Sequence, residues 1–214
     1  MSVWIGLVSF AAVAGLLTLV PGVDTALVLR AAIVRGTRHA FATALGVGTG
    51  VLVWGAAAAC GLSALLTTSQ LAYTVLRIAG AAYLVWLGVK TLVALWHGRA
   101  SVEAAEDGDA SGGLLRAWAR GAATNLLNPK IGVFYIAMLP QFIPPEAPQL
   151  AMGVALAVVH DIEGMLWFSV LIFGVRYTRT WVARPSVERA MEAVTGSVLL
   201  AFGLKLAFSE DGRS

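Results

Sequence analysis

Three short groups of polar residues interrupt the apolar stretches of this sequence, and each could carry chemistry. The groups are Pro21-Gly22-Val23-Asp24, Asn125-Leu-Leu-Asn128-Pro129-Lys130 and His160-Asp161-Ile162-Glu163. Carboxylates, amides and an imidazole can bind an ammonium group, coordinate a cation or carry a proton. The two prolines would also shape the backbone around a binding site, because proline cannot continue a regular helix.

The two prolines predict helix breaks. Asn128 is a good N-cap and Pro129 suits the first position of a helix, so a new helix is expected to start there; Pro21-Gly22 could restart a helix in the same way. A helix N-terminus has free N–H groups and attracts carboxylates. Two such ends facing a common cavity would suit the carboxylate of an amino acid or another small anion. Plain proline kinks without a ligand are the alternative.

Two acidic residues lie in apolar sequence. Asp24 follows the first break, and Asp161 lies near the middle of a long apolar segment. A charge at the centre of a bilayer costs about 2.5–3.5 kcal/mol, so such a residue is expected to face water, a partner or a substrate. Either carboxyl could bind a substrate ammonium or carry a coupling proton, as a proton-coupled carrier requires.

His160 and Glu163 lie three residues apart and therefore share one face of a helix, whereas Asp161 points about 160° away from Glu163. The spacing favours a pair of residues that neutralise each other at least as much as two ligands. Asp161 has no such partner and is the stronger candidate. Polar groups on two sides of this helix predict that it is central in the bundle.

The elements that position these residues must lie in a membrane. Of the 214 residues 58% are apolar and 13% charged, and no charged residue occurs between His39 and Arg77. A soluble domain carries roughly 25% charged residues, and one membrane span needs about 20 apolar residues. Soluble enzymes, disordered chains and disulfide scaffolds are excluded, the last also because Cys60 is the only cysteine. The basic residues lie in short loops, which does not indicate nucleic-acid binding.

Six apolar segments predict six transmembrane helices, over residues 3–29, 40–66, 71–96, 120–144, 148–175 and 190–208. The hydrophilic stretch 97–116 predicts a flexible cytoplasmic linker. Lys and Arg are concentrated around the loops after the first, third and fifth segments. Because positive charge marks cytoplasmic loops, both termini are expected outside.

The two halves of the chain resemble each other. The third and sixth segments share a Gly…Gly-x-Lys pattern that begins at Gly80 and Gly196, and the first and fourth both contain a break. We therefore predict an all-α membrane protein with one domain over 1–214, built from inverted three-helix repeats over 1–96 and 117–208 in which helices one and four are broken. The small residues Gly46, Gly48 and Gly50 predict close helix packing.

Together these features resemble the lysine exporter (LysE/RhtB) family of bacterial amino-acid efflux carriers, over nearly the whole chain. The motifs that carry the resemblance are Pro21-Gly22-Val23-Asp24, Gly46-x-Gly48-x-Gly50, Gly80-Ala-Ala-Tyr-Leu-Val-Trp-Leu-Gly88, Asn125-Leu-Leu-Asn128-Pro129-Lys130 and Pro140-Gln141-Phe142. Family members commonly have a second proline where this chain has Val23, and His160 and Glu163 are not typical of them.

The resemblance implies a multi-pass exporter of the bacterial inner membrane that moves an amino acid or a related metabolite. The driving force would be the proton gradient or the membrane potential. The motif residues that carry over as pathway residues are Asp24, Asn125, Asn128, Pro129 and Lys130. The expected partners are a small-molecule substrate, protons and lipid; the choice of amino acid and the oligomeric state, a homo-oligomer included, stay open.

Two other functions fit some of the same residues. A divalent-metal exporter would use the oxygen and nitrogen ligands of Asp24, Asn125, Asn128, His160, Asp161 and Glu163. A membrane enzyme would use His160 and Glu163 as a general base, but no nucleophile motif accompanies them. The sequence has no nucleotide-binding motif, so we expect a gradient-driven carrier that is not an enzyme and needs no cofactor.

Overall fold

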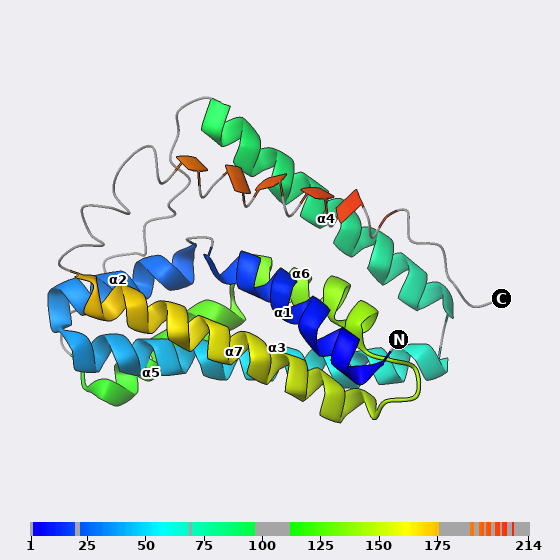
Figure 1. Cartoon of the computed structure of the whole chain (residues 1–214), viewed down its shortest axis with the longest axis horizontal. Coiled ribbons are helices and arrows are strands. Elements are labelled where there is room, and N and C mark those ends of the chain that lie inside the picture. The colour runs from blue at the N-terminus through cyan, green and yellow to red at the C-terminus, as the bar shows by residue number, and fades with distance from the viewer. Residues whose placement is uncertain are drawn as a thin grey trace.

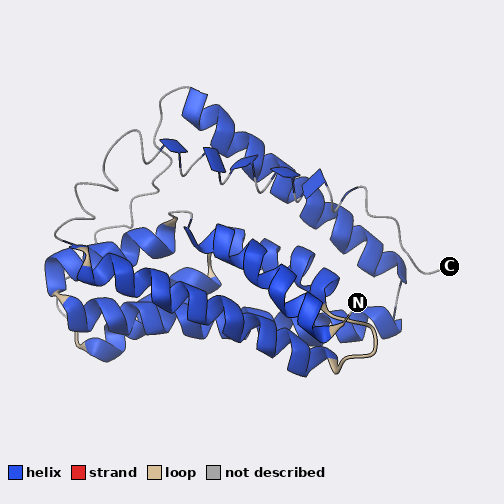
Figure 2. Cartoon of the chain, viewed as in Figure 1, coloured by secondary structure: helices blue, strands red, loops and turns tan. Residues whose placement is uncertain are grey.

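The computed structural model of the protein describes residues 2–19, 22–68, 70–96 and 112–175, together with single residues and short pieces between 189 and 207. Within these residues all regular structure is helical and no strand is present (Figure 2). The prediction of an all-α protein is therefore confirmed for the described part of the chain.

The long helices lie side by side along the longest dimension of the molecule (Figure 1). In chain order the elements are α1 (Val3–Leu19), α2 (Val23–Arg35), α3 (Thr37–Thr68), α4 (Gln70–Trp96), α5 (Leu114–Leu126), α6 (Pro129–Met138), the short 3-10 helix η1 (Leu139–Phe142) and α7 (Gln149–Phe173). Helix α3 is central, because it packs against α2, α4, α5, α6 and α7.

The described helices include segments long and apolar enough to cross a bilayer. Thr37–Gly61 of α3 and all of α7 meet this test singly, and α1 and α2 meet it together as one bent span. These spans fit a helical membrane protein. The six-span inverted repeat stays a prediction, since the predicted sixth span, 190–208, is described only at single residues and short pieces.

Both expected helix breaks are present. Helix α1 ends at Leu19 and α2 begins at Val23, with the two axes at 56°; Gly22 is the N-cap of α2, while Pro21 lies outside the described residues. Helix α5 ends at Leu126, and α6 begins at Pro129 after the N-cap Asn128. The breaks leave two helix N-termini inside apolar sequence. There the positive ends of the helix dipoles could attract a negatively charged group of a ligand.

Some predicted boundaries were wrong. Helix α5 begins at Leu114, so the last residues of the predicted linker, 97–116, are helical, and residues 97–111 lie outside the described part. Helix α2 continues to Arg35, beyond the predicted end of the first segment at residue 29. The reason is the same in both places: arginine is a good helix former, so a helix can continue past the apolar residues through Arg30 and Arg35 or through Arg116.

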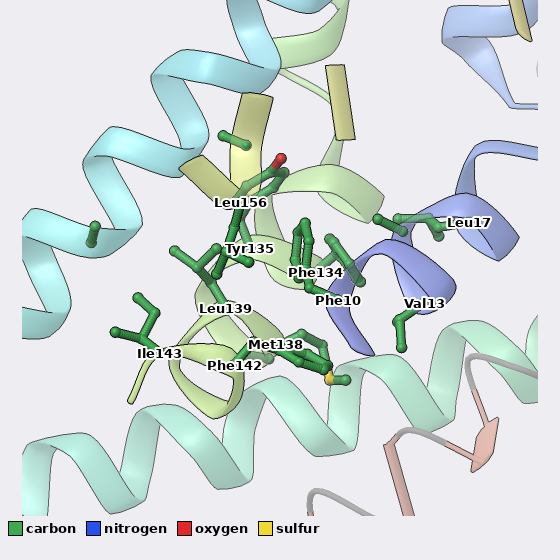
Figure 3. Packing of buried hydrophobic residues seen from close by; sticks show 14 of the residues in the cluster. Phe10, Val13, Leu17, Phe134, Tyr135, Met138, Leu139, Phe142, Ile143 and Leu156 are labelled. Atoms are coloured by element: carbon green, nitrogen blue, oxygen red, sulfur yellow. The ribbon is translucent and has the colours of Figure 1, made fainter. Parts of the chain in front are cut away.

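Buried apolar residues form two cores. The first core joins α1, α6, η1 and parts of α3 and α7 around Phe10, whose ring lies 5.9 Å from that of Phe134 and 5.4 Å from that of Phe142 (Figure 3). The second core joins α2 to the first half of α3 and the end of α7, and includes Val28, Ala32, Ala40, Ala44, Val47, Phe168, Leu171 and Ile172. Helices α3 and α7 thus contribute to both cores.

Small residues let α3 approach its neighbours closely, as the glycine pattern predicts. A Cβ atom on Gly46 would overlap the backbone of Trp118 in α5, and one on Gly121 would overlap the backbone of Thr43. Towards α7, a Cβ on Gly153 would lie 3.3 Å from the carbonyl oxygen of Gly55. The backbones of these helices are therefore in direct contact, a packing that any larger residue would prevent.

Candidate functional site

A cavity of about 60 Å³ lies where the two cores meet. We call it the central cavity. Its lining residues come from α1, α2, α3, α5, α6 and α7 and from the break before α6: Leu17, Thr18, Gly22, Asp24, Thr25, Val47, Gly48, Val51, Asn125, Asn128, Lys130, Ile131, His160, Asp161, Gly164 and Phe168. One water needs about 10–15 Å³ by this measure, so the cavity has room for several.

Asp24 joins the two broken helix pairs. It lies in the first turn of α2, and its Oδ2 accepts a hydrogen bond of 3.0 Å from Asn125 Nδ2 and one of 3.1 Å from Asn128 Nδ2. All three side chains are buried. The residues are about 100 positions apart in the sequence, yet one carboxylate oxygen connects the start of α2 to the end of α5 and the start of α6.

The N-terminus of α6 opens to the same cavity. Asn128 Oδ1 caps the helix by accepting a hydrogen bond of 3.0 Å from the Lys130 backbone N–H, and Pro129 occupies the first turn. The Lys130 ammonium points back towards α2: a Cβ on Gly22 would lie 3.9 Å from Lys130 Nζ. Lys130 also interacts electrostatically with Asp24. A cation, an anion and two helix N-termini therefore share one small space.

Two glycines of α3 leave the space that the polar side chains fill. A Cβ on Gly48 would overlap Asp161 Oδ1 of α7, and one on Gly50 would lie 2.6 Å from Asn125 Oδ1 of α5. Positions 48 and 50 are about 200° apart on a helix, so they face different neighbours. The sequence predicts only close packing for this stripe. Its part in the site was missed, and the two-residue spacing, which places the two glycines on different sides of α3, was the available signal.

His160 and Glu163 do not form the pair that their spacing favours. His160 Nδ1 is hydrogen-bonded to the Tyr135 hydroxyl at 3.0 Å, across to α6. Glu163 faces α1 instead, where a Cβ on Gly15 would lie 3.4 Å from its Oε1. Its buried Oε2 has no hydrogen-bond partner among the described residues. The pair fails because each side chain reaches a different neighbouring helix, which spacing along α7 could not reveal.

Three buried oxygen atoms beside the central cavity have no hydrogen-bond partner among the described residues. They are Thr18 Oγ1, Asp24 Oδ1 and Asn125 Oδ1. A buried polar atom without a partner costs about 1–3 kcal/mol, so this set favours a ligand that donates hydrogen bonds. The sequence does not single out Thr18, since a single threonine near a helix end forms no distinctive pattern. The described residues contain no group of three or more His, Cys, Asp or Glu placed to hold a metal ion.

Comparison with known proteins assigns the chain to a family. The sequence model described as "LysE type translocator" matches residues 16–210. The chain belongs to the LysE translocator family. The family consists of transporters rather than enzymes, and the resemblance seen in the sequence is confirmed.

Several LysE relatives align over almost their full length. The chain is 31% identical to the homoserine/homoserine lactone efflux protein of Salmonella typhimurium (90% of this chain, 91% of the relative). It is 32% identical to the leucine efflux protein of Klebsiella pneumoniae (88% of each). It is 27% identical to the membrane protein YrhP of Bacillus subtilis (95% and 99%). No solved structure matches the chain.

The cavity of this LysE protein brings together almost all the residues that the sequence singled out. Seven of its lining residues were candidates: Gly22, Asp24, Asn125, Asn128, Lys130, His160 and Asp161. An eighth candidate, Pro129, does not line the cavity but begins α6 directly beside it. Glu163 does not line the cavity, and Pro21 lies outside the described residues. The candidates therefore form one site with two exceptions, and their functional roles follow only as a proposal.

The Asn128 side chain makes two interactions, the cap of α6 and the hydrogen bond to Asp24, and different substitutions can remove them separately. Asn128→Ala removes both the cap of α6 and a hydrogen bond to Asp24, and is expected to lower the free energy of unfolding by about 2 kcal/mol. Asn128→Ser keeps a capping oxygen but loses the amide donor, so its stability should be closer to that of the unaltered chain. Thermal unfolding in detergent measures the difference; equal losses for both variants would contradict the capping role.

Proposed function

We propose that this LysE protein exports an amino acid across the bacterial inner membrane by alternating access, coupled to the proton gradient. The observation that carries the proposal is the buried network of Asp24 with Asn125 and Asn128 at the central cavity. A bundle that only needed to be stable would not place a carboxylate, an ammonium and two helix N-termini around one space. Relatives named as efflux proteins for homoserine and leucine support the same class of substrate.

The charges around the cavity match a zwitterion. The Lys130 ammonium and the positive end of the α6 helix dipole would attract the substrate carboxylate, since a cation and a helix N-terminus both favour an anion. Asp161, which reaches the cavity past Gly48, would bind the substrate ammonium. Asp24 offers a second acceptor, because its Oδ1 has no protein partner among the described residues. An amino acid supplies both charges at the distance of one carbon atom.

The driving force needs no cofactor. A membrane potential supplies about 2.3 kcal/mol per elementary charge per 100 mV, which supports roughly a fifty-fold concentration gradient for each charge moved. The coupling proton would be carried by Asp24 or Asp161, the two carboxyl groups of the cavity. Export would result if the cavity bound the substrate while open to the cytoplasm and bound the proton while open to the outside.

The packing of α4 supports the proposed inverted repeat, with six spans and both termini outside. A Cβ on Gly88 would lie 2.8 Å from the backbone of Gly196 and Leu200, and one on Gly203 would lie 2.8 Å from the backbone of Val85. Gly88 and Gly203 hold the same place in the two similar segments. Each of these two glycines therefore contacts equivalent positions of the other segment. Two antiparallel repeats related by a two-fold axis are expected to pack in this way.

Reconstitution tests the proposal. Proteoliposomes containing the full chain would be loaded with a panel of amino acids and, separately, divalent metals, and release would be followed after a pH gradient is imposed. We expect gradient-dependent release of one or a few amino acids, with none from liposomes lacking protein. Release of metal ions alone would overturn the proposal in favour of a metal exporter.

A further inference from the structure

His160 is held in the wall of the central cavity by Tyr135. The imidazole is buried, with 5% of the residue exposed, and lines the cavity. Its Nδ1 is hydrogen-bonded to the Tyr135 hydroxyl at 3.0 Å, and the two rings are stacked, with centroids 5.8 Å apart and planes at 23°. Two independent contacts therefore fix the orientation of the imidazole ring.

Tyr135 is itself fixed by the first core. It is completely buried, and its ring packs edge-on against Phe134 at 5.7 Å and against Phe10 at 6.5 Å (Figure 3). A tyrosine enclosed in this way has one available rotamer, so its hydroxyl is a fixed hydrogen-bonding point. His160 cannot turn without losing that bond.

The second nitrogen of His160 is available to a ligand. Nδ1 is occupied by Tyr135, whereas Nε2 has no hydrogen-bond partner among the described residues. The two nitrogens lie on different edges of the imidazole, so a ring whose Nδ1 is bound to the core can present Nε2 to the cavity that it lines. A neutral imidazole is either donor or acceptor at Nε2, depending on which nitrogen carries the hydrogen.

The position along α6 fits the side chain of a bound amino acid. Tyr135 lies five residues beyond Lys130, which corresponds to about 7.5 Å along the helix axis. A substrate whose carboxylate is held at the start of α6 would extend its side chain in the direction of the His160–Tyr135 pair. The cavity lining also includes apolar side chains, among them Val51 and Ile131.

We propose that His160, positioned by Tyr135, selects an amino acid with a hydroxyl group on its side chain over one with an apolar side chain. A hydroxyl both donates and accepts, so it satisfies Nε2 in either tautomer. An apolar side chain would leave Nε2 unpaired in a buried site, which discriminates strongly against it. This inference rests on the proposed export of amino acids and adds the substrate class and the selecting residue.

Transport ratios test the selection. Proteoliposomes with the full chain would be assayed for efflux of homoserine and serine against leucine and valine. The unaltered chain is expected to favour the hydroxyl substrates at least tenfold in kcat/KM, and His160→Leu to reduce that ratio at least tenfold. His160→Gln, which keeps a hydrogen-bonding group, should restore part of the preference. Val158→Leu, at an exposed position of α7, is the control that should leave the ratio unchanged.

Tyr135→Phe separates positioning from structure. Loss of the hydroxyl should raise KM for homoserine severalfold with kcat nearly unchanged, and should affect leucine less. Equal losses for both substrates in the His160 and Tyr135 variants would show a structural role and overturn the inference, as would an unaltered chain that prefers leucine. If the unaltered chain releases no amino acid at all, the proposed function itself fails; the two failures are thus distinguishable.

Discussion

Replacing Asp24 with asparagine is expected to abolish coupled efflux while the protein remains folded in the membrane. An asparagine at this position has nearly the same shape, and its carbonyl oxygen can still accept the hydrogen bonds that Asn125 and Asn128 donate to Asp24 Oδ2. What disappears is the negative charge, together with the ability to bind a proton. Losing one member of a buried charged interaction costs about 2–5 kcal/mol, so transport should fall about a hundredfold or more.

The experiment compares transport with the amount of folded protein. Efflux from proteoliposomes is measured beside the monodisperse fraction in detergent. Asp161→Asn is expected to give the same loss, because its carboxylate reaches the same cavity. Glu146→Gln makes the same chemical change at an exposed residue and should transport normally. Full transport by both Asp24→Asn and Asp161→Asn would sink the proposed mechanism.

Replacing Gly46 with leucine is expected to prevent stable folding. At this position α3 contacts α5 through main-chain atoms, and a Cβ would overlap the carbonyl group of Trp118. A clash with backbone cannot be relieved by turning a side chain, so the helices would have to separate along the length of their contact. Overpacking usually costs about 1–3 kcal/mol and sometimes more; with a rigid neighbour we expect at least the upper end of this range.

Gly61 provides a matched control in the same helix. A Cβ at this position would meet no atom within 4 Å, so Gly61→Ala should only gain helix propensity, up to about 1 kcal/mol. Gly46→Ala should destabilise despite the same gain. Thermal unfolding of the purified variants measures both effects. Similar stability of Gly46→Ala and Gly61→Ala would mean that the two helices are not in backbone contact there.

Interactions within one segment could be predicted from the sequence, and those between segments mostly could not. Asn128 caps α6 and Pro129 starts it because both effects depend on residues a few positions apart. The two breaks, the apolar helices and the close packing at Gly46 follow from local chemistry in the same way. The family resemblance then brought Asn125 into the candidate site.

The rest of the site depends on how each helix is rotated about its axis. Gly48 meets Asp161 across more than a hundred residues, and His160 meets Tyr135 on another helix. No spacing rule along one helix specifies such a contact. The alternative in which His160 and Glu163 form a pair is not seen for the same reason: His160 contacts Tyr135 of α6, whereas Glu163 faces Gly15 of α1.

The two cores have a mechanical consequence. Among the described residues, α1 and α6 belong to the first core and α2 to the second, and the two breaks lie beside the central cavity, which Gly22 and Asn128 line. Of the described helices that line the cavity, α3 and α7 alone continue past it without a break. We therefore expect the bundle to bend more easily at the level of the central cavity than within either core. Bending at this level would change access to the central cavity.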